Sequence, residues 1–305
     1  GEIVPHEVPL PEPGPGEVRV RLEGCGVCGS DLPVYQGRPW FDYPREPGAP
    51  GHEGWGRVDA AGPGAGLEVG TRVAGLSYHA YADHDLARAD QLVVLPPELD
   101  DQPFPGEALG CAVNVFRRSG ITAGDTVAVV GVGFLGALVT QLAADAGARV
   151  IGISRRASAR RVATDMGAAD VLALEENPVA AVEELTDGRL CDVVVEAAGV
   201  QATLDLTGPL TRERGRIVVA GFHQDGPRQV DMQLWNWRGL DVVNAHERDP
   251  AVYLGGIRLA AAAIAAGRLD PSSLYTHAFD LGEVGAALQT AVDRPDGFLK
   301  ALVRT

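Results

Sequence analysis

The 305-residue sequence lacks three features that would each indicate a particular class of protein. No uninterrupted apolar run reaches membrane-spanning length, since the alanine-rich stretch Leu259–Ala266 is too short. There is no excess of positive charge: the net charge of −15 argues against a nucleic-acid or anionic-membrane surface. Cysteines are few and scattered, which does not suggest a disulfide framework. We therefore expect a cytoplasmic protein with reduced thiols, one or two of which bind metal; the cysteines are Cys25, Cys28, Cys111 and Cys191.

The sequence pattern changes near residue 110. Before it, short alternating segments such as Glu17–Leu22 are broken by proline and glycine clusters, which is typical of a compact antiparallel β domain. After residue 120, the apolar strand Thr126–Val130 is of the kind buried on both faces of a parallel sheet. Helix and strand then alternate, which predicts a doubly wound nucleotide-binding sheet. The further elements expected are a helix at Ala137–Ala146 and strands at Arg149–Ile153, Asp192–Glu196, Arg216–Ala220 and Leu240–Val243.

The last part of the chain is expected to return to the first domain. A helix at about Tyr253–Ala266 precedes a strand at Tyr275–Phe279, a second helix at Glu283–Val292 and a closing strand at Leu299–Val303. The sequence thus predicts one domain from residues 1–111 and 246–305, and a nucleotide-binding domain from residues 112–245.

The turn after the first apolar strand fits the pattern G-x-G-x-x-G. Its glycines permit a tight turn, a close approach of backbone to a pyrophosphate and close helix–strand packing, while the helix N-terminus faces the phosphate charge. The pattern is weak alone and strong between a strand and a helix. We expect a dinucleotide to contact Gly131, Gly133, Phe134, Leu135 and Gly136.

The second strand of this domain ends at Ser154, where a sheet that binds NAD usually carries an acidic residue for the ribose 2′-hydroxyl. Arg155 and Arg156 follow instead, and Arg160 lies one helical turn beyond. A hydroxyl and guanidinium groups can bind a 2′-phosphate, which a carboxylate would repel. Solvated surface arginines are the alternative interpretation. The sequence favours NADP(H) over NAD(H).

The first domain contains two short motifs with metal-binding side chains, Cys28-Gly29-Ser30-Asp31 and Gly51-His52-Glu53. Gly106-Glu107-Ala108-Leu109-Gly110-Cys111 leads into the second domain. Thiolate, imidazole and carboxylate are all good zinc ligands, and three protein ligands with an open position make a catalytic zinc site. Spacing this wide is not diagnostic by itself.

Together these motifs resemble the zinc-containing medium-chain dehydrogenase/reductase (alcohol dehydrogenase) family, in its polyol- and threonine-dehydrogenase-like branch. The resemblance implies an α/β protein with a GroES-like, mostly antiparallel β catalytic domain and a Rossmann domain. It implies that Cys28 and His52 bind one catalytic zinc, with Glu107 as third ligand and Cys111 as the alternative. Glu53 would be an outer or transient ligand.

Other roles are also implied by this resemblance. Ser30 matches the residue that takes the proton of the substrate hydroxyl, and Asp31 matches a carboxylate close to the metal. Lys300 resembles a cation near the cofactor phosphates, and Gly199 is expected at the cofactor. Cys25 and Cys191 have no such role and are expected to be small buried hydrophobes.

The sequence departs from this family in two places. The segment between Val73 and Pro96 has no cysteine, so the structural zinc that some members carry is expected to be missing. Pro33 stands where some relatives have a histidine that passes the proton to solvent.

The resemblance implies hydride transfer between NADP(H) and a small alcohol or carbonyl substrate, with a secondary alcohol favoured and a homodimer or larger homo-oligomer expected. Two alternatives stay open: a zinc-free quinone or enoyl reductase of the same superfamily, and a catalytically silent NADP-binding protein. The pair Cys28 and His52 argues against the first, and the retention of Ser30 against the second.

Overall fold

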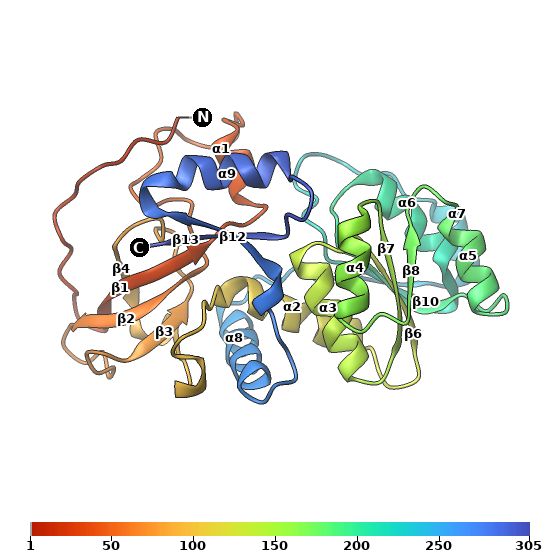
Figure 1. The fold of residues 1–305 in the computed structure, drawn as a ribbon, viewed down its shortest axis with the longest axis horizontal. Coiled ribbons are helices and arrows are strands. Elements are labelled where there is room, and N and C mark those ends of the chain that lie inside the picture. The colour runs from red at the N-terminus through yellow and green to blue at the C-terminus, as the bar shows by residue number, and fades with distance from the viewer. Residues whose placement is uncertain (1) are drawn as a thin grey trace. The chain divides into compact units, whose positions relative to one another are not determined.

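A computed structural model describes residues 2–305, and the chain forms two compact units (Figure 1). Unit 1 comprises Gly1–Gly110 and Arg248–Thr305, and unit 2 comprises Cys111–Glu247. The two boundaries lie one residue and two residues from those expected from the sequence. The C-terminal segment therefore belongs with the N-terminal β domain.

Unit 1 is built on a seven-stranded sheet with the order β12-β13-β1-β2-β3-β5, and β4 also pairs with β1. All its neighbouring strands are antiparallel except β12 and β13. Alternate residues of β1 are buried in the core, as expected for a strand with one face on the core. The strands are β1 (Glu17–Gly26), β2 (Gly54–Ala61), β3 (Arg72–Gly75), β4 (His84–Arg88), β5 (Leu92–Val94), β12 (Tyr275–Asp280) and β13 (Lys300–Arg304).

Two helices of unit 1 pack on different parts of its sheet. α9 (Val284–Asp293) packs on β12 and β13 through side chains spaced three and four residues apart, which places them on one helix face: Val284, Ala287, Leu288 and Ala291. α1 (Asp31–Tyr35) contacts α9, and α8 (Pro250–Ala265) contacts β3 and β5. The 3-10 turns are Ala89–Gln91, Pro97–Leu99, Ser272–Leu274 and Leu281–Glu283.

Unit 2 is a six-stranded parallel sheet with the order β11-β10-β9-β6-β7-β8 and helices on both sides (Figure 1). The strand order reverses between β6 and β9, the place where such sheets bind ligands at the carboxyl ends of their strands. The strands are β6 (Thr126–Val130), β7 (Arg149–Ser154), β8 (Asp170–Ala173), β9 (Cys191–Glu196), β10 (Thr211–Val219) and β11 (Asp241–Asn244). The helices are α3 (Phe134–Asp145), α4 (Ala157–Asp165), α5 (Pro178–Leu185), α6 (Gln201–Leu210) and α7 (Met232–Arg238). α2 (Gly106–Ser119) begins in unit 1 and ends in unit 2.

Three elements of unit 2 differ from the sequence-based expectation. β8 was not expected, because it is short and carries no long apolar run. β10 begins at Thr211 rather than Arg216, and its register with β9 shifts where Arg214 has a positive φ of 55°. α3 begins directly after Gly133, so the helix N-terminus adjoins the glycine-rich turn.

The burial of two cysteines agrees with the sequence-based interpretation. Cys25 and Cys191 are fully buried in hydrophobic clusters, and burial raises the pKa of the Cys25 thiol and raises that of Cys191 to about 12. All four cysteines are free thiols. Within residues 2–305, no helix combines the length and the apolar character needed to cross a membrane.

Asp85 gives unit 1 a pH-dependent stability. It lies on β4 opposite Val20, is 8% exposed and accepts a hydrogen bond from the Ser77 hydroxyl. Burial raises the pKa of Asp85 from 3.8 to about 6, against the lowering effects of His79 and the Leu86 backbone. Because the folded state binds this proton more tightly, its contribution to stability is present at low pH and is lost as the pH rises through about 6.

We predict that Asp85→Asn stabilises the protein at pH 8 by about 1–3 kcal/mol and changes its stability little near pH 4. The amide removes the buried charge and keeps an oxygen for Ser77. Thermal unfolding at both pH values measures the difference, with Asp83→Asn as the exposed control on the preceding turn. An equal shift of the melting temperature at both pH values would contradict the assignment.

Candidate metal centre and dinucleotide-binding turn

Cys28, His52 and Glu53 form a candidate metal centre in unit 1. One ligand atom from each lies within 4.8 Å of the others, and no further group of this kind occurs within residues 2–305. The register of two strands explains the approach: Cys25 on β1 pairs with Gly54 on β2. The chain leaving β1 and the chain entering β2 are therefore neighbours. A thiolate, an imidazole and a carboxylate are a donor set that suits Zn²⁺.

His52 is oriented so that one ring nitrogen faces the cluster. Its Nδ1 lies 3.0 Å from Oδ1 of Asp31 and 2.9 Å from the Pro50 carbonyl oxygen. Both partners are acceptors, so Nδ1 carries the hydrogen and the Nε2 lone pair is left for a metal. Ser30 Oγ lies 3.3 Å from this Nε2. The Ser30 hydroxyl makes no capping bond to α1 and is thus directed to the site.

Asp31 ties together the residues around the cluster. It is 0% exposed, and its Oδ2 accepts hydrogen bonds from the Cys28 backbone N–H at 2.9 Å and from the Tyr81 hydroxyl at 2.7 Å. Burial, reinforced by the Asp31 charge, raises the pKa of Tyr81 well above its ordinary value, so the phenol is a donor. One buried carboxylate thus positions both sides of the candidate centre.

The electrostatics of His52 also favour a bound cation. Burial lowers the pKa of His52, but Asp31 and Cys28 outweigh this and raise it well above its ordinary value. The surroundings therefore favour positive charge at the imidazole. A divalent cation competes with this proton, because only the neutral ring can act as a ligand.

Glu53 pairs with Lys300 inside unit 1. Nζ of Lys300 lies 2.7 Å from Oε1 and 2.5 Å from Oε2 of Glu53, and the two residues are 4% and 0% exposed. Burial lowers the pKa of Lys300, but the Glu53 charge outweighs it and the net shift is upward. Gly26 is required here, since a Cβ would lie 1.9 Å from Oε2 of Glu53. The sequence had suggested a place near the cofactor phosphates for Lys300 and had missed this pair.

Neither residue suggested as third ligand belongs to the group of Cys28, His52 and Glu53, whose ligand atoms lie within 4.8 Å of one another. Glu107 lies in the first turn of α2, in unit 1, and Cys111 is the first residue of unit 2. Glu53, expected only as an outer or transient ligand, is the residue that the structure brings beside Cys28 and His52. Glu107 as ligand stays a prediction.

The connection between β3 and β4 lies against the same centre. The ring of Tyr78 stacks on His52 at a centroid distance of 6.4 Å and an interplanar angle of 29°. The backbone N–H groups of Ala80 and Tyr81 donate to the Gly51 and Gly48 carbonyls at 2.9 and 3.0 Å. This short segment, which has no cysteine, fixes the loop that carries His52.

The glycine-rich turn of unit 2 has the geometry that its pattern predicts. Gly131 has a φ of 100°, which side chains rarely adopt, and Gly136 has no room for a Cβ, which would lie 2.1 Å from the Gly131 carbonyl oxygen. Gly133 precedes α3 in extended conformation, and Phe134 and Leu135 open the helix. The N-terminus of α3 therefore begins inside the turn, as an anion-binding turn requires.

The end of β7 carries the residues expected to choose the cofactor. Ser154 is the last residue of β7 and is buried, whereas the Arg155 side chain is exposed and has no partner within residues 2–305. Arg156 precedes α4. Arg160, also expected at the cofactor, donates from NH1 at 2.9 Å to the carbonyls of both Ser154 and Arg155. Arg160 thus holds the turn in place.

Gly199 lies in the loop after β9, and both of its polar backbone groups are occupied. Its N–H donates to Oε1 of Glu196 at 2.8 Å, and its carbonyl accepts from NH2 of Arg228 at 3.2 Å. Its φ of 76° and the nearby Phe222 backbone exclude a side chain. The sequence did not single out Glu196 or Arg228; a charged residue ending the apolar run Val193–Val195 was the available signal.

Comparisons with known proteins cover both units. Residues 14–97 match the family model of the alcohol dehydrogenase GroES-like domain, and residues 135–261 match that of the zinc-binding dehydrogenases. The chain is 28% identical to the 2-dehydro-3-deoxy-L-galactonate 5-dehydrogenase of Pseudoalteromonas atlantica, over 95% of this chain and 92% of that one. It is 32% identical to the L-threonine 3-dehydrogenase of Pyrococcus furiosus, over 71% of each chain.

A solved structure is similar over nearly the whole length. A protein from Sinorhizobium meliloti described as a zinc-binding dehydrogenase, bound to NADP, has a TM-score of 0.85 and 28% identity. The match covers 98% of this chain and 94% of that protein. It therefore includes both the candidate metal centre and the dinucleotide-binding turn.

We predict that Cys28→Ala and His52→Ala each abolish tight zinc binding, and that Asp31→Asn weakens it by about 10–100-fold because His52 loses the carboxylate that orients it. Competition with a chromogenic chelator measures the zinc affinity. Tyr81→Phe keeps the carboxylate and is the matched control, with a loss expected below about tenfold. Unchanged zinc affinity in Asp31→Asn would show that the carboxylate does not support the ligand.

Proposed function

The chain belongs to the zinc-containing alcohol dehydrogenases of the medium-chain dehydrogenase/reductase family, and we propose that it transfers hydride between a secondary alcohol and NADP(H). The observation that carries the proposal is the group Cys28, His52 and Glu53, with Nε2 of His52 directed into it by Asp31. In a zinc-dependent oxidoreductase that acts on CH–OH, such a group holds the Lewis acid beside the reacting oxygen.

We assign the zinc ligands and the proton acceptor of this site to particular residues. Zinc supplies a Lewis acid that lowers the pKa of an alcohol oxygen. We assign Cys28 and His52 as its ligands, with Glu107 as third ligand and Glu53 as a transient one. Ser30 accepts the proton of the substrate hydroxyl, for which its position 3.3 Å from the metal-facing nitrogen of His52 is suited. Pro33 offers no proton-transfer group, so the proton leaves Ser30 by another route.

We propose one zinc per chain. Within residues 2–305, a single group of side chains brings three possible ligands together, and the segment between Val73 and Pro96 has no cysteine for a second, structural site. Backbone hydrogen bonds from Ala80 and Tyr81 give the shortened segment its support instead.

The relatives support a substrate class. The two named relatives are dehydrogenases of a sugar-acid derivative at position 5 and of L-threonine at position 3. Both positions are secondary alcohols with a polar group on a neighbouring carbon. We propose a hydroxylated secondary alcohol as substrate, with the exposed Tyr78 ring beside His52 as part of the wall that meets it.

The cofactor proposal rests on the end of β7. Ser154 offers a hydroxyl, Arg155 an exposed guanidinium and Arg156 a second cation, and no carboxylate stands there to repel a 2′-phosphate. The Sinorhizobium meliloti structure, which holds NADP, supports this choice.

We predict that NADP⁺ is preferred over NAD⁺ by about ten- to a few hundred-fold in kcat/KM, since charge-assisted hydrogen bonds contribute roughly 1.5–3 kcal/mol each. Ser154→Asp should reverse the preference, and Arg155→Ala should weaken NADP⁺ while leaving NAD⁺ nearly unchanged. The assay uses a panel of polyols, sugar acids and hydroxy acids with both cofactors at fixed ionic strength.

Arg161→Ala is the matched control. Like Arg155, Arg161 is exposed, but it lies within α4 and farther along the chain from Ser154. It should leave the preference unchanged. Equal kcat/KM for both cofactors would reject the role of Arg155. Absence of turnover with every alcohol in the panel, from zinc-loaded protein, would argue instead for a reductase or a silent cofactor-binding protein.

We also propose that the chain forms at least a homodimer through β11. This strand ends the sheet of unit 2, and an unpaired edge with an apolar side chain favours association. Val242 on β11 is 41% exposed, and Trp237 on α7 is 85% exposed.

We predict that Val242→Lys yields a monomer, because a lysine on an edge strand opposes pairing with another edge. Sizing with light scattering at micromolar concentration reports the mass. Val171→Lys, on the opposite edge strand β8 where Val171 is 36% exposed, is the control and should keep the oligomer. A monomeric unmutated protein would refute the proposal.

A further inference from the structure

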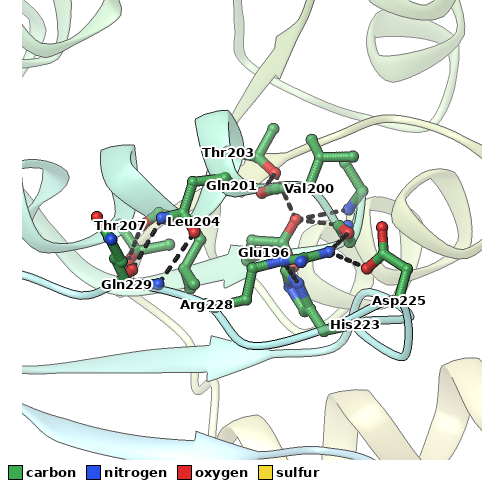
Figure 2. A network of polar contacts seen from close by, with 12 residues as sticks. Glu196, Val200, Gln201, Thr203, Leu204, Thr207, His223, Asp225, Arg228 and Gln229 are labelled. Carbon is green, nitrogen blue, oxygen red and sulfur yellow. Dashed lines mark hydrogen bonds and ion pairs between the residues drawn. The ribbon is translucent and has the colours of Figure 1, made fainter.

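Glu196 is a buried carboxylate whose two oxygens have different partners (Figure 2). It is the last residue of β9 and is 0% exposed. Oε1 accepts from the backbone N–H of Ala198 at 2.9 Å and of Gly199 at 2.8 Å, and from the Thr203 hydroxyl at 2.6 Å. Oε2 lies 2.8 Å from Nε2 of His223. The first oxygen thus shapes the loop after β9, and the second reaches the loop after β10.

Arg228 completes the arrangement behind His223. Its Nε donates to Nδ1 of His223 at 3.0 Å, its NH2 donates to the Gly199 carbonyl at 3.2 Å, and it pairs with Asp225. A guanidinium N–H can only donate, so Nδ1 of His223 is an acceptor without hydrogen. His223 is therefore the neutral tautomer whose Nε2–H donates to Glu196.

The loop held by Glu196 lies against the glycine-rich turn. The Ala197 N–H donates to the Val130 carbonyl at 2.9 Å, directly before Gly131. A Cβ on Gly131 would lie 2.7 Å from Cβ of Ala198 and 2.9 Å from its backbone nitrogen. The conformation of the glycine-rich turn therefore depends on the position of the loop after β9. Both lie where the strand order reverses between β6 and β9.

We propose that Glu196, His223 and Arg228 form a positioning relay that holds the loop 197–200 in the shape the dinucleotide requires. The role rests on the proposed dinucleotide-dependent function. The Glu196 carboxylate fixes two amides of the loop, and His223 satisfies the oxygen that would otherwise be a buried, unpaired acceptor. Arg228 fixes the ring of His223 and also the Gly199 carbonyl. The three residues of the relay act on the cofactor through the backbone of the loop 197–200.

The relay is tested by the affinity of the purified, zinc-loaded chain for NADPH, from the fluorescence of bound nicotinamide. His223→Leu removes the donor to Glu196 and should weaken binding by about tenfold or more. His223→Gln can donate to Glu196 and accept from Arg228 through one amide, and should restore binding to within about threefold of the unmutated chain. Melting temperatures of both variants establish that they are folded.

Arg212→Leu is the matched control. Arg212 pairs with Asp192 at 2.6 Å, near the opposite end of the strand that carries Glu196. This variant should lose stability without a change in NADPH affinity. Two results would overturn the relay. One is an NADPH affinity of His223→Leu equal to that of the unmutated chain, and the other is an equal loss of affinity in His223→Leu and His223→Gln.

A second readout does not depend on cofactor. In long-range ¹H–¹⁵N correlation spectra of the free protein at neutral pH, the His223 signals are those that disappear in His223→Gln. These signals should show the pattern of the Nε2–H tautomer. A protonated Nδ1 would overturn the relay even if NADPH binds. If the tautomer is as stated and neither NADPH nor NADH binds the unmutated chain, the proposed function fails and the relay has no cofactor to position.

Discussion

Three fully buried carboxylates, Asp31, Glu53 and Glu196, set the constraint on which both candidate sites depend. A charge removed from water destabilises the fold by several kcal/mol unless hydrogen-bond donors or an opposite charge surround it. Asp31 and Glu196 therefore collect donors from several segments of chain, and Glu53 pairs with the single cation Lys300. The segments that they join adjoin the candidate metal centre and the glycine-rich turn.

In unit 1 this constraint ties the C-terminal segment to the candidate metal centre. Glu53 stands next to His52, and its charge is balanced by Lys300, which lies 247 residues later in the chain at the start of β13. β13 pairs with β1, the strand that leads to Cys28. The chain must therefore return from unit 2 before the surroundings of the metal ligands are complete. Asp31 joins two nearer segments in the same way, because it accepts hydrogen bonds from Cys28 and Tyr81.

Local patterns in the sequence predicted five of the six strands of unit 2, all except β8, but not these partners. The apolar run Thr126–Val130 and the glycine-rich turn depend on neighbouring residues, so spacing reveals them. Cys28 and His52 were assigned through the family resemblance. Lys300 and His223 acquire their partners only through strand order, which spacing does not encode. The resemblance favoured Glu107 as third ligand, which stays a prediction, and it did not place Glu53 within 4.8 Å of Cys28 and His52.

The two carboxylate–histidine pairs explain why one histidine can bind metal and the other cannot. At His52 the acceptors Asp31 and Pro50 both lie near Nδ1, which leaves the Nε2 lone pair for a ligand. At His223 the carboxylate faces Nε2, and Arg228 occupies the remaining lone pair on Nδ1. The ring is then fully hydrogen-bonded and has no nitrogen left for a ligand. The same pair of residue types therefore leaves one ring nitrogen available for a ligand at His52 and uses both ring nitrogens at His223, because a cation stands behind only the second ring.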